Sequence, residues 1–179
     1  MRKLNMFLVI GMIVTFLAHA IMGSVQLFGA DANTLKGIAW TSVALIVAHM
    51  IVTTILTVET LHARRKSGAG YFKNNLLFWT RRISGFTIII PLLMHLVIFR
   101  ASNADAYRLQ VFTTGKLISQ ILLVAAIALH VITNIKPVLI SFGIRGLKSY
   151  FTDILFILSI LLLFFAAAFA VYYLRWMTV

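Results

Sequence analysis

The chain has 179 residues, 61% of them hydrophobic, and a mean hydropathy of +1.01. Soluble domains are about half apolar, so this composition excludes an ordinary soluble domain and indicates an integral membrane protein. The chain has no cysteine, which excludes disulfides, thiolate metal sites and iron–sulfur ligation by its own residues. A net charge of +12 would suit a nucleic-acid partner, but the basic residues fall in short loops between apolar stretches, so we expect none.

Five apolar stretches are long enough to cross a bilayer, whose core of about 30 Å needs about 20 helical residues. They lie at about residues 5–29, 38–61, 83–101, 116–136 and 150–174, with short connections between them. We therefore predict an all-α integral membrane protein, a bundle of five transmembrane helices that forms a single domain over residues 1–179.

The first stretch also has features of a secretory signal. Met1-Arg-Lys precedes an apolar run, and Ala18-His19-Ala20 matches a small-residue cleavage site. The apolar run nevertheless continues through Val25 and Phe28, beyond the usual length of a signal core. We therefore expect this segment to be retained as the first membrane helix.

The basic residues predict the orientation of the bundle. If the N-terminus is cytoplasmic, eleven Lys and Arg residues lie on the inner side and five on the outer side, as is typical of bacterial inner-membrane proteins. The inner set is Arg2, Lys3, Arg64, Arg65, Lys66, Lys73, Arg81, Arg82, Lys136, Arg145 and Lys148, and the outer set is Lys36, Arg100, Arg108, Lys116 and Arg175. We expect a multi-pass protein of the cell inner membrane.

Four histidines, His19, His49, His95 and His130, each lie alone in a different apolar stretch. Ionisable residues within membrane spans are rare and functional by default, and neutral imidazole is a common metal ligand. Four single histidines on four helices match the requirement of two haems with two axial imidazoles each. A single intramembrane histidine would equally suit a polar link between helices, and we expect His62, beside Ala63-Arg64-Arg65, to be solvated.

Depth along the helices favours one pairing of these histidines. Counted from the inner helix ends, His19, His95 and His130 lie about 21, about 18 and about 9 Å deep, and His49 lies about 18 Å deep. This favours His19 with His95 as the outer pair, which leaves His49 with His130, although depth alone does not force the choice.

Two prolines interrupt the predicted helices. Pro91 removes a helical hydrogen bond four residues before His95 and should bend that helix near Thr87. Pro137 is expected to end the fourth helix after Lys136.

The third span begins with Asn75-Leu-Leu-Phe-Trp79-Thr-Arg81-Arg82-Ile-Ser84-Gly85 and reaches His95 ten residues after Gly85. This segment resembles the membrane cytochrome b subunit of succinate:quinone oxidoreductases and quinol:fumarate reductases. Helix count, the order of the histidines and the charge bias are similar to the single-subunit, five-helix, dihaem type.

The resemblance implies two haems b, a distal one held by His19 and His95 and a proximal one held by His49 and His130. It also implies partners: an iron–sulfur subunit and a FAD-bearing flavoprotein on the cytoplasmic side, and quinone, with menaquinone the family expectation, within the lipid bilayer. The chain would carry electrons and react with quinone, without binding succinate or fumarate itself, so no catalytic residue is expected for that reaction. The small residues from Ala166 to Ala170 would suit helix packing or a homodimer of complexes.

Further residues are candidates for haem propionates, quinone and protons, since anionic propionates need cations or donors. Plain interfacial cations are an equal alternative for each basic residue. Asp31 is a candidate quinol proton acceptor, with Asp105 as an alternative, and Ala128 stands where some family members have an acidic residue. The proximal haem or quinone candidates are Arg82, Ser84, Lys136 and Arg145, and the distal propionate candidates are Lys36, Arg100 and Lys116.

Three other functions remain open at this point. An anchor of another dehydrogenase, such as a hydrogenase, would typically carry two ligands on one helix, a pattern absent here. A transporter that uses histidines for protons or metal ions would lack haem absorption and need more polar helices, and a purely structural anchor would also lack haem.

Overall fold

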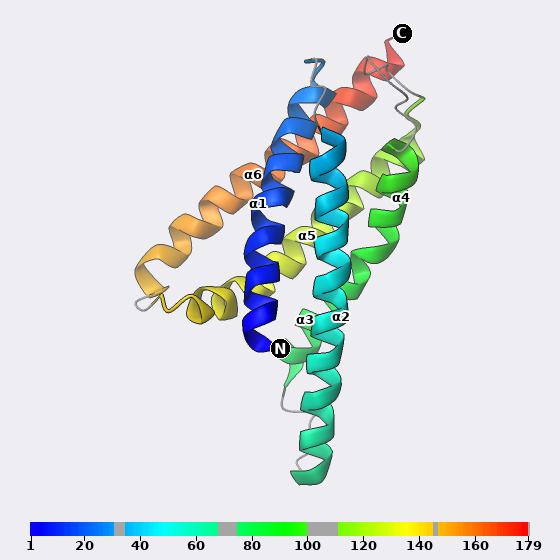
Figure 1. Ribbon diagram of the computed structural model, residues 1–179. Coiled ribbons are helices and arrows are strands. Elements are labelled where there is room, and N and C mark those ends of the chain that lie inside the picture. The colour runs from blue at the N-terminus through cyan, green and yellow to red at the C-terminus, as the bar shows by residue number, and fades with distance from the viewer. Residues whose placement is uncertain (31–34, 68–74, 100–110, 145–146, 179) are drawn as a thin grey trace. The chain divides into compact units, whose positions relative to one another are not determined.

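The computed structural model describes residues 1–30, 35–67, 75–99, 111–144 and 147–178. These residues form six helices, and none of them is in a strand (Figure 1). The helices are α1 (Arg2–Leu27), α2 (Leu35–Ser67), α3 (Leu76–Thr87), α4 (Ile89–Phe99), α5 (Thr114–Ser141) and α6 (Leu147–Met177). The prediction of an all-α fold is confirmed.

Within the described residues, five helical segments are long and apolar enough to cross a membrane, with α3 and α4 together forming one of them. The five segments are Lys3–Leu27, Lys36–Lys66, Leu76–Phe99, Thr114–Ser141 and Tyr150–Met177. Large apolar side chains such as Ile90 and Leu163 are exposed, as expected where lipid is the solvent. By length and composition the chain is a multi-pass membrane protein, as the sequence predicted.

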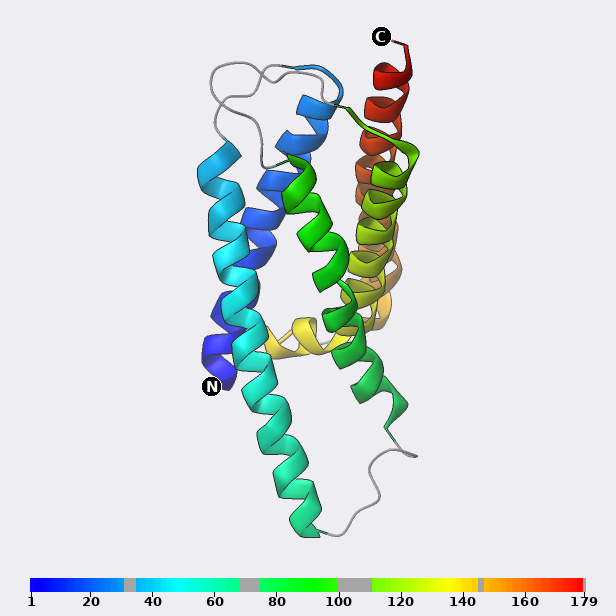
Figure 2. The same ribbon diagram turned by 90° about the vertical axis from the view of Figure 1, so that its right-hand side faces the viewer.

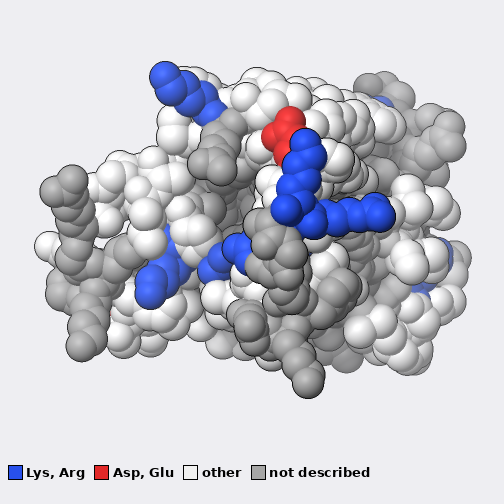
Figure 3. All heavy atoms as spheres, turned by 90° about the horizontal axis from the view of Figure 1, so that it is seen from below, with Lys and Arg blue, Asp and Glu red and all other residues white. Residues whose placement is uncertain are grey.

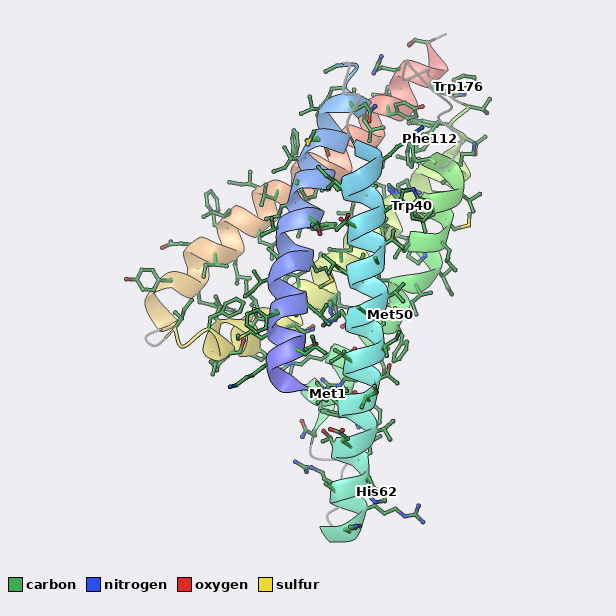
Figure 4. The ribbon with its side chains drawn as sticks, in the orientation of Figure 1. Met1, Trp40, Met50, His62, Phe112 and Trp176 are labelled. Atoms are coloured by element: carbon green, nitrogen blue, oxygen red, sulfur yellow. The ribbon has the colours of Figure 1, made fainter. Side chains whose placement is uncertain are left out.

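Helix α2 is longer than its predicted span. Its 33 residues extend for about 50 Å, against a hydrocarbon core of about 30 Å. The last turn is basic, with exposed Arg64, Arg65 and Lys66, and long Lys and Arg side chains project from the surface in the end-on view of Figure 3. His62 is exposed near this end of α2 (Figure 4), which agrees with the expected solvated position.

The third span is divided at Ile88, between the end of α3 and the start of α4. Pro91 explains the break, because it has no N–H to donate to the carbonyl of Thr87. The helical pattern resumes when the N–H of Leu92 donates to the carbonyl of Ile88 at 2.9 Å. The predicted bend near Thr87 is therefore present.

Pro137, in contrast, does not end the fourth span, and that prediction is wrong. Helix α5 continues through it to Ser141, and Figure 2 shows the last turns of α5 at a steep angle to the rest of the helix. Pro137 deprives the carbonyl of Thr133 of its helical donor. Nε of Arg81 in α3 replaces that donor at 2.9 Å, so the helix bends without losing a hydrogen bond.

The chain divides into two compact units. The first comprises residues 1–20 and 34–76, in which α1 and α2 run antiparallel side by side (Figures 1 and 2). Gly11 of α1 faces Leu45 of α2, because a Cβ added at Gly11 would be in van der Waals contact with Cδ1 of Leu45, at 3.5 Å.

The second unit comprises residues 21–33 and 77–179, with α5 packed against both α4 and α6. Its buried core consists of Leu27, Ile98, Phe112, Ala168, Phe169 and Tyr172. The rings of Phe112 and Tyr172 meet edge to face, with centroids 5.0 Å apart, and Trp176 packs against this core from the end of α6 (Figure 4). The aromatic cluster thus joins α4, the start of α5 and the end of α6.

Candidate functional site

His95 of α4 faces a buried amide on α5. Its Nδ1 lies 2.7 Å from Oε1 of Gln120, and Gln120 has no exposed surface. The amide group is oriented by its own bonds, since Nε2 of Gln120 donates to Oγ of Ser119 at 3.0 Å and that hydroxyl donates to the carbonyl of Lys116 at 2.7 Å. An amide oxygen only accepts, so Nδ1 of His95 carries the proton.

The ring of His95 is also held by aromatic neighbours. Its centroid lies 5.0 Å from that of Phe99, one turn further along α4, and 6.3 Å from that of Phe169 in α6, in an edge arrangement. The imidazole is thus fixed both by its hydrogen bond and by packing. Because Nδ1 carries the proton, the lone pair that can bind a metal is on Nε2.

His130 of α5 has an analogous arrangement against α3. Its Nδ1 lies 3.1 Å from Oγ of Ser84, whose exposed fraction is 1%. The Ser84 hydroxyl also lies 3.1 Å from the carbonyl of Arg81, and when its proton goes to that carbonyl, Oγ accepts from Nδ1–H of His130. Nδ2 of Asn134 lies 3.4 Å from Nδ1 and donates to the carbonyl of His130 at 2.8 Å. With the proton on Nδ1, the lone pair of His130 would be on Nε2.

Gly85 allows the ring of His130 to lie against α3. A Cβ added at Gly85 would lie 3.2 Å from Cε1 of His130 and 3.5 Å from its Nδ1. The Ser84-Gly85 pair therefore supplies both the hydrogen bond to this imidazole and the space for it. The sequence segment that carried the family resemblance is placed directly against one of the four histidines.

The two histidines of the second unit lie at different levels. The third span runs antiparallel to α5, because Ser84 contacts His130 and the later residue His95 contacts the earlier residue Gln120. His95 therefore lies at the same depth as Gln120. Gln120 and His130 are ten residues apart, or about 15 Å along the helix.

The two histidines of the first unit are separated by a similar distance. Gly11 and Leu45 lie at the same level of the antiparallel α1 and α2. His19 lies eight residues beyond Gly11 in one direction, and His49 lies four residues beyond Leu45 in the other. Together these twelve residues correspond to about 18 Å along the helix axes.

The remaining candidates are less specifically placed. The Arg82 guanidinium lies over the Phe78 ring, 4.2 Å from its centroid. Thr113 caps the start of α5, because its Oγ1 accepts from the backbone N–H of Lys116, and Nζ of Lys116 donates to the carbonyl of Val111. Lys36 and Lys136 are exposed. Asp31, Arg100, Asp105 and Arg145 lie outside the described residues.

The sequence interpretation missed Gln120. An indication was available, because an amide side chain within a membrane span needs a partner for the same reason that a histidine does. Which histidine it would meet depends on the register of α4 against α5, which the sequence does not reveal.

No protein-family model matches the chain, and the searches of curated proteins and of solved structures found no significant match either.

Proposed function

We propose that the chain is the dihaem cytochrome b membrane subunit of a succinate:quinone oxidoreductase or quinol:fumarate reductase. It would carry electrons between membrane quinone and a cytoplasmic iron–sulfur subunit. The observation that carries the proposal is the arrangement of His95 and His130, in which Nδ1 of each ring lies within hydrogen-bond distance of a buried oxygen, Oε1 of Gln120 or Oγ of Ser84. This is the usual arrangement of a histidine whose Nε2 binds a metal, since its other ring nitrogen then needs an acceptor.

The levels of the histidines support their proposed pairing. In a five-span chain, the connection after α1 and the connection after α4 fall on the same side of the membrane. His19 and His95 are each the histidine nearer to that side in their own unit, and His49 and His130 are each the farther one. The separations of about 18 Å and about 15 Å differ by less than one helical turn. These levels are compatible with the proposal that His19 pairs with His95 and His49 with His130, with one haem for each pair.

The histidines of this chain suit electron transfer. A haem with two axial imidazoles has no open position for oxygen or substrate and exchanges single electrons. The protein holds the rings of His95 and His130 by hydrogen bonds and packing, which orients Nε2. Arg82 and Lys136 on the proximal side, with Arg145, and Lys36, Arg100 and Lys116 on the distal side are proposed to neutralise propionates, and Asp31 to accept quinol protons.

Haem content tests the proposal directly. The full-length protein, purified from a haem-producing host, should show two low-spin b-type haems per polypeptide in its reduced-minus-oxidised spectrum. His19→Ala and His95→Ala should each remove the same haem, and His49→Ala and His130→Ala the other. His62→Ala is the matched control and should keep both haems. One haem or none in the wild-type protein would contradict the proposal, as would ligand variants that affect haems in other combinations.

The partners require a separate test. Purification of the intact complex from native membranes should recover an iron–sulfur subunit and a flavoprotein with FAD, and the complex should turn over succinate or fumarate with menaquinone or ubiquinone. If the dihaem protein is recovered with a different dehydrogenase, the proposal of a dihaem cytochrome would stand, but its assignment to succinate:quinone oxidoreductases and quinol:fumarate reductases would be wrong.

A further inference from the structure

The two most buried polar side chains among the described residues are Gln120 and Ser84, with exposed fractions of 0% and 1%. Each lies within hydrogen-bond distance of Nδ1 of a different intramembrane histidine, at 2.7 Å for Gln120 and 3.1 Å for Ser84. Burying a polar group in a membrane span costs free energy unless the group has a hydrogen-bond partner. His95 is the partner of Gln120, and His130 is the partner of Ser84. Both residues therefore contact a histidine that is proposed as a haem ligand, and they could influence that ligand.

We propose that Gln120 and Ser84 are positioning residues that set the reduction potentials of the two haems separately, through Nδ1 of His95 and of His130. This inference rests on the proposed function. An acceptor on Nδ1–H makes the imidazole a stronger donor through Nε2 and favours the oxidised iron.

The two acceptors differ in strength. Oε1 of Gln120 receives the proton of His95 at 2.7 Å, and the amide is itself polarised because Nε2 donates to Ser119. Oγ of Ser84 lies farther from Nδ1 of His130, at 3.1 Å, and would accept the proton more weakly. Chains of hydrogen bonds strengthen their members. The difference between these two hydrogen bonds should therefore lower the reduction potential of the His95 haem relative to that of the His130 haem.

The test is a redox titration of the purified dihaem protein, in which the two haems are distinguished by their spectra. Each haem is first assigned from the one that survives in His95→Ala and in His130→Ala. Gln120→Leu removes the acceptor and should raise the potential of the His95 haem alone, changing its reduced-to-oxidised ratio at fixed potential by on the order of tenfold, or about 59 mV for one electron. Ser84→Ala should raise the potential of the His130 haem alone.

Two further variants separate tuning from a merely structural role. Gln120→Glu keeps the acceptor and adds charge, so the potential of the His95 haem should fall, whereas a packing defect would not reverse the sign. Ser159→Ala is the matched control for Ser84→Ala, because the Ser159 hydroxyl also donates to a helix carbonyl, that of Leu155, but contacts no histidine among the described residues. It should leave both potentials unchanged.

The outcomes distinguish this inference from the function on which it rests. Absence of haem from the wild-type protein would reject the proposed function. Two haems with the expected histidine dependence, but with potentials that do not move or that move together in Gln120→Leu and Ser84→Ala, would overturn the positioning role and leave the cytochrome intact. If Gln120→Leu fails to bind haem, Gln120→Glu decides by the sign of its shift.

Discussion

At the scale of single residues, the candidate site depends on which ring nitrogen of a histidine carries the proton. Nδ1 of His95 donates to an amide oxygen, and Nδ1 of His130 lies 3.1 Å from a hydroxyl oxygen, so the proposed ligand role requires the same tautomer in both rings. Neither acceptor is charged, which suits a site within the membrane because an uncompensated carboxylate there would be costly. The groups that face Nδ1 of the two histidines, an amide and a hydroxyl, are both neutral.

Substitution of Gly85 tests the space beside His130. Gly85→Ala adds a methyl group 3.2 Å from Cε1 of the imidazole, so the ring must shift by a few tenths of an ångström. We expect the helix to tolerate alanine, which is a better helix former than glycine by about 1 kcal/mol, while the spectrum and potential of the proposed His130 haem change. Gly85→Leu should lose that haem.

Gly37→Ala is the matched control, since a Cβ at Gly37 meets nothing within 4 Å. It should keep both haems unchanged in the same spectra. A normal His130 haem in Gly85→Leu would show that the close approach of α3 to His130 is not needed for binding.

At the scale of helices, two prolines bend two spans, and the chain compensates for them differently. At Pro91 the helical pattern breaks at Ile88, between α3 and α4. At Pro137 the helix continues, because Nε of Arg81 satisfies the carbonyl of Thr133. Arg81 therefore links α3 to α5 one turn beyond His130, and the bend in α5 and the position of that histidine are coupled through a side chain.

A double-mutant cycle tests this link. Arg81→Ala leaves the Thr133 carbonyl without a donor in the membrane and should lower the free energy of unfolding by about 1–3 kcal/mol. Pro137→Ala restores an N–H at that position, so Arg81→Ala should cost less in its background. Thermal unfolding in detergent, followed by circular dichroism, measures both effects.

The coupling energy between Arg81 and Pro137 should be about 0.5 kcal/mol or more. Arg81→Lys is the informative third variant, because lysine keeps the charge but has no Nε–H on a guanidinium plane. It should behave as Arg81→Ala if the hydrogen bond matters. Strictly additive effects of Arg81→Ala and Pro137→Ala would contradict the role assigned to Arg81.

At the scale of the whole molecule, five spans and the bias of Lys and Arg toward one side predict a cytoplasmic N-terminus. The proposed function needs this orientation, since the proximal haem must face the iron–sulfur partner. The basic end of α2, with Arg64, Arg65 and Lys66, would then lie in the cytoplasm, and the end of α6 would lie outside.

Single cysteines test the orientation without interference, because the chain has none of its own. Ala63→Cys and Thr178→Cys place thiols at exposed positions near the ends of α2 and α6. A membrane-impermeant maleimide should label Thr178→Cys while the inner membrane is intact, and Ala63→Cys only after permeabilisation. The reverse pattern would place the histidine levels on the opposite sides and contradict a cytoplasmic iron–sulfur partner on the side of the proximal haem.

The sequence by itself determined the class of protein, the five spans, the isolated histidines and the bend before His95, because hydropathy, length and proline chemistry are local properties of the chain. It did not identify Gln120 as the partner of His95, the placement of Ser84 and Gly85 against His130, or the rescue of the Pro137 bend by Arg81. Each of these joins residues between 25 and 52 positions apart. Only the register between packed helices brings such residues together, and that register is a product of side-chain packing over whole helices.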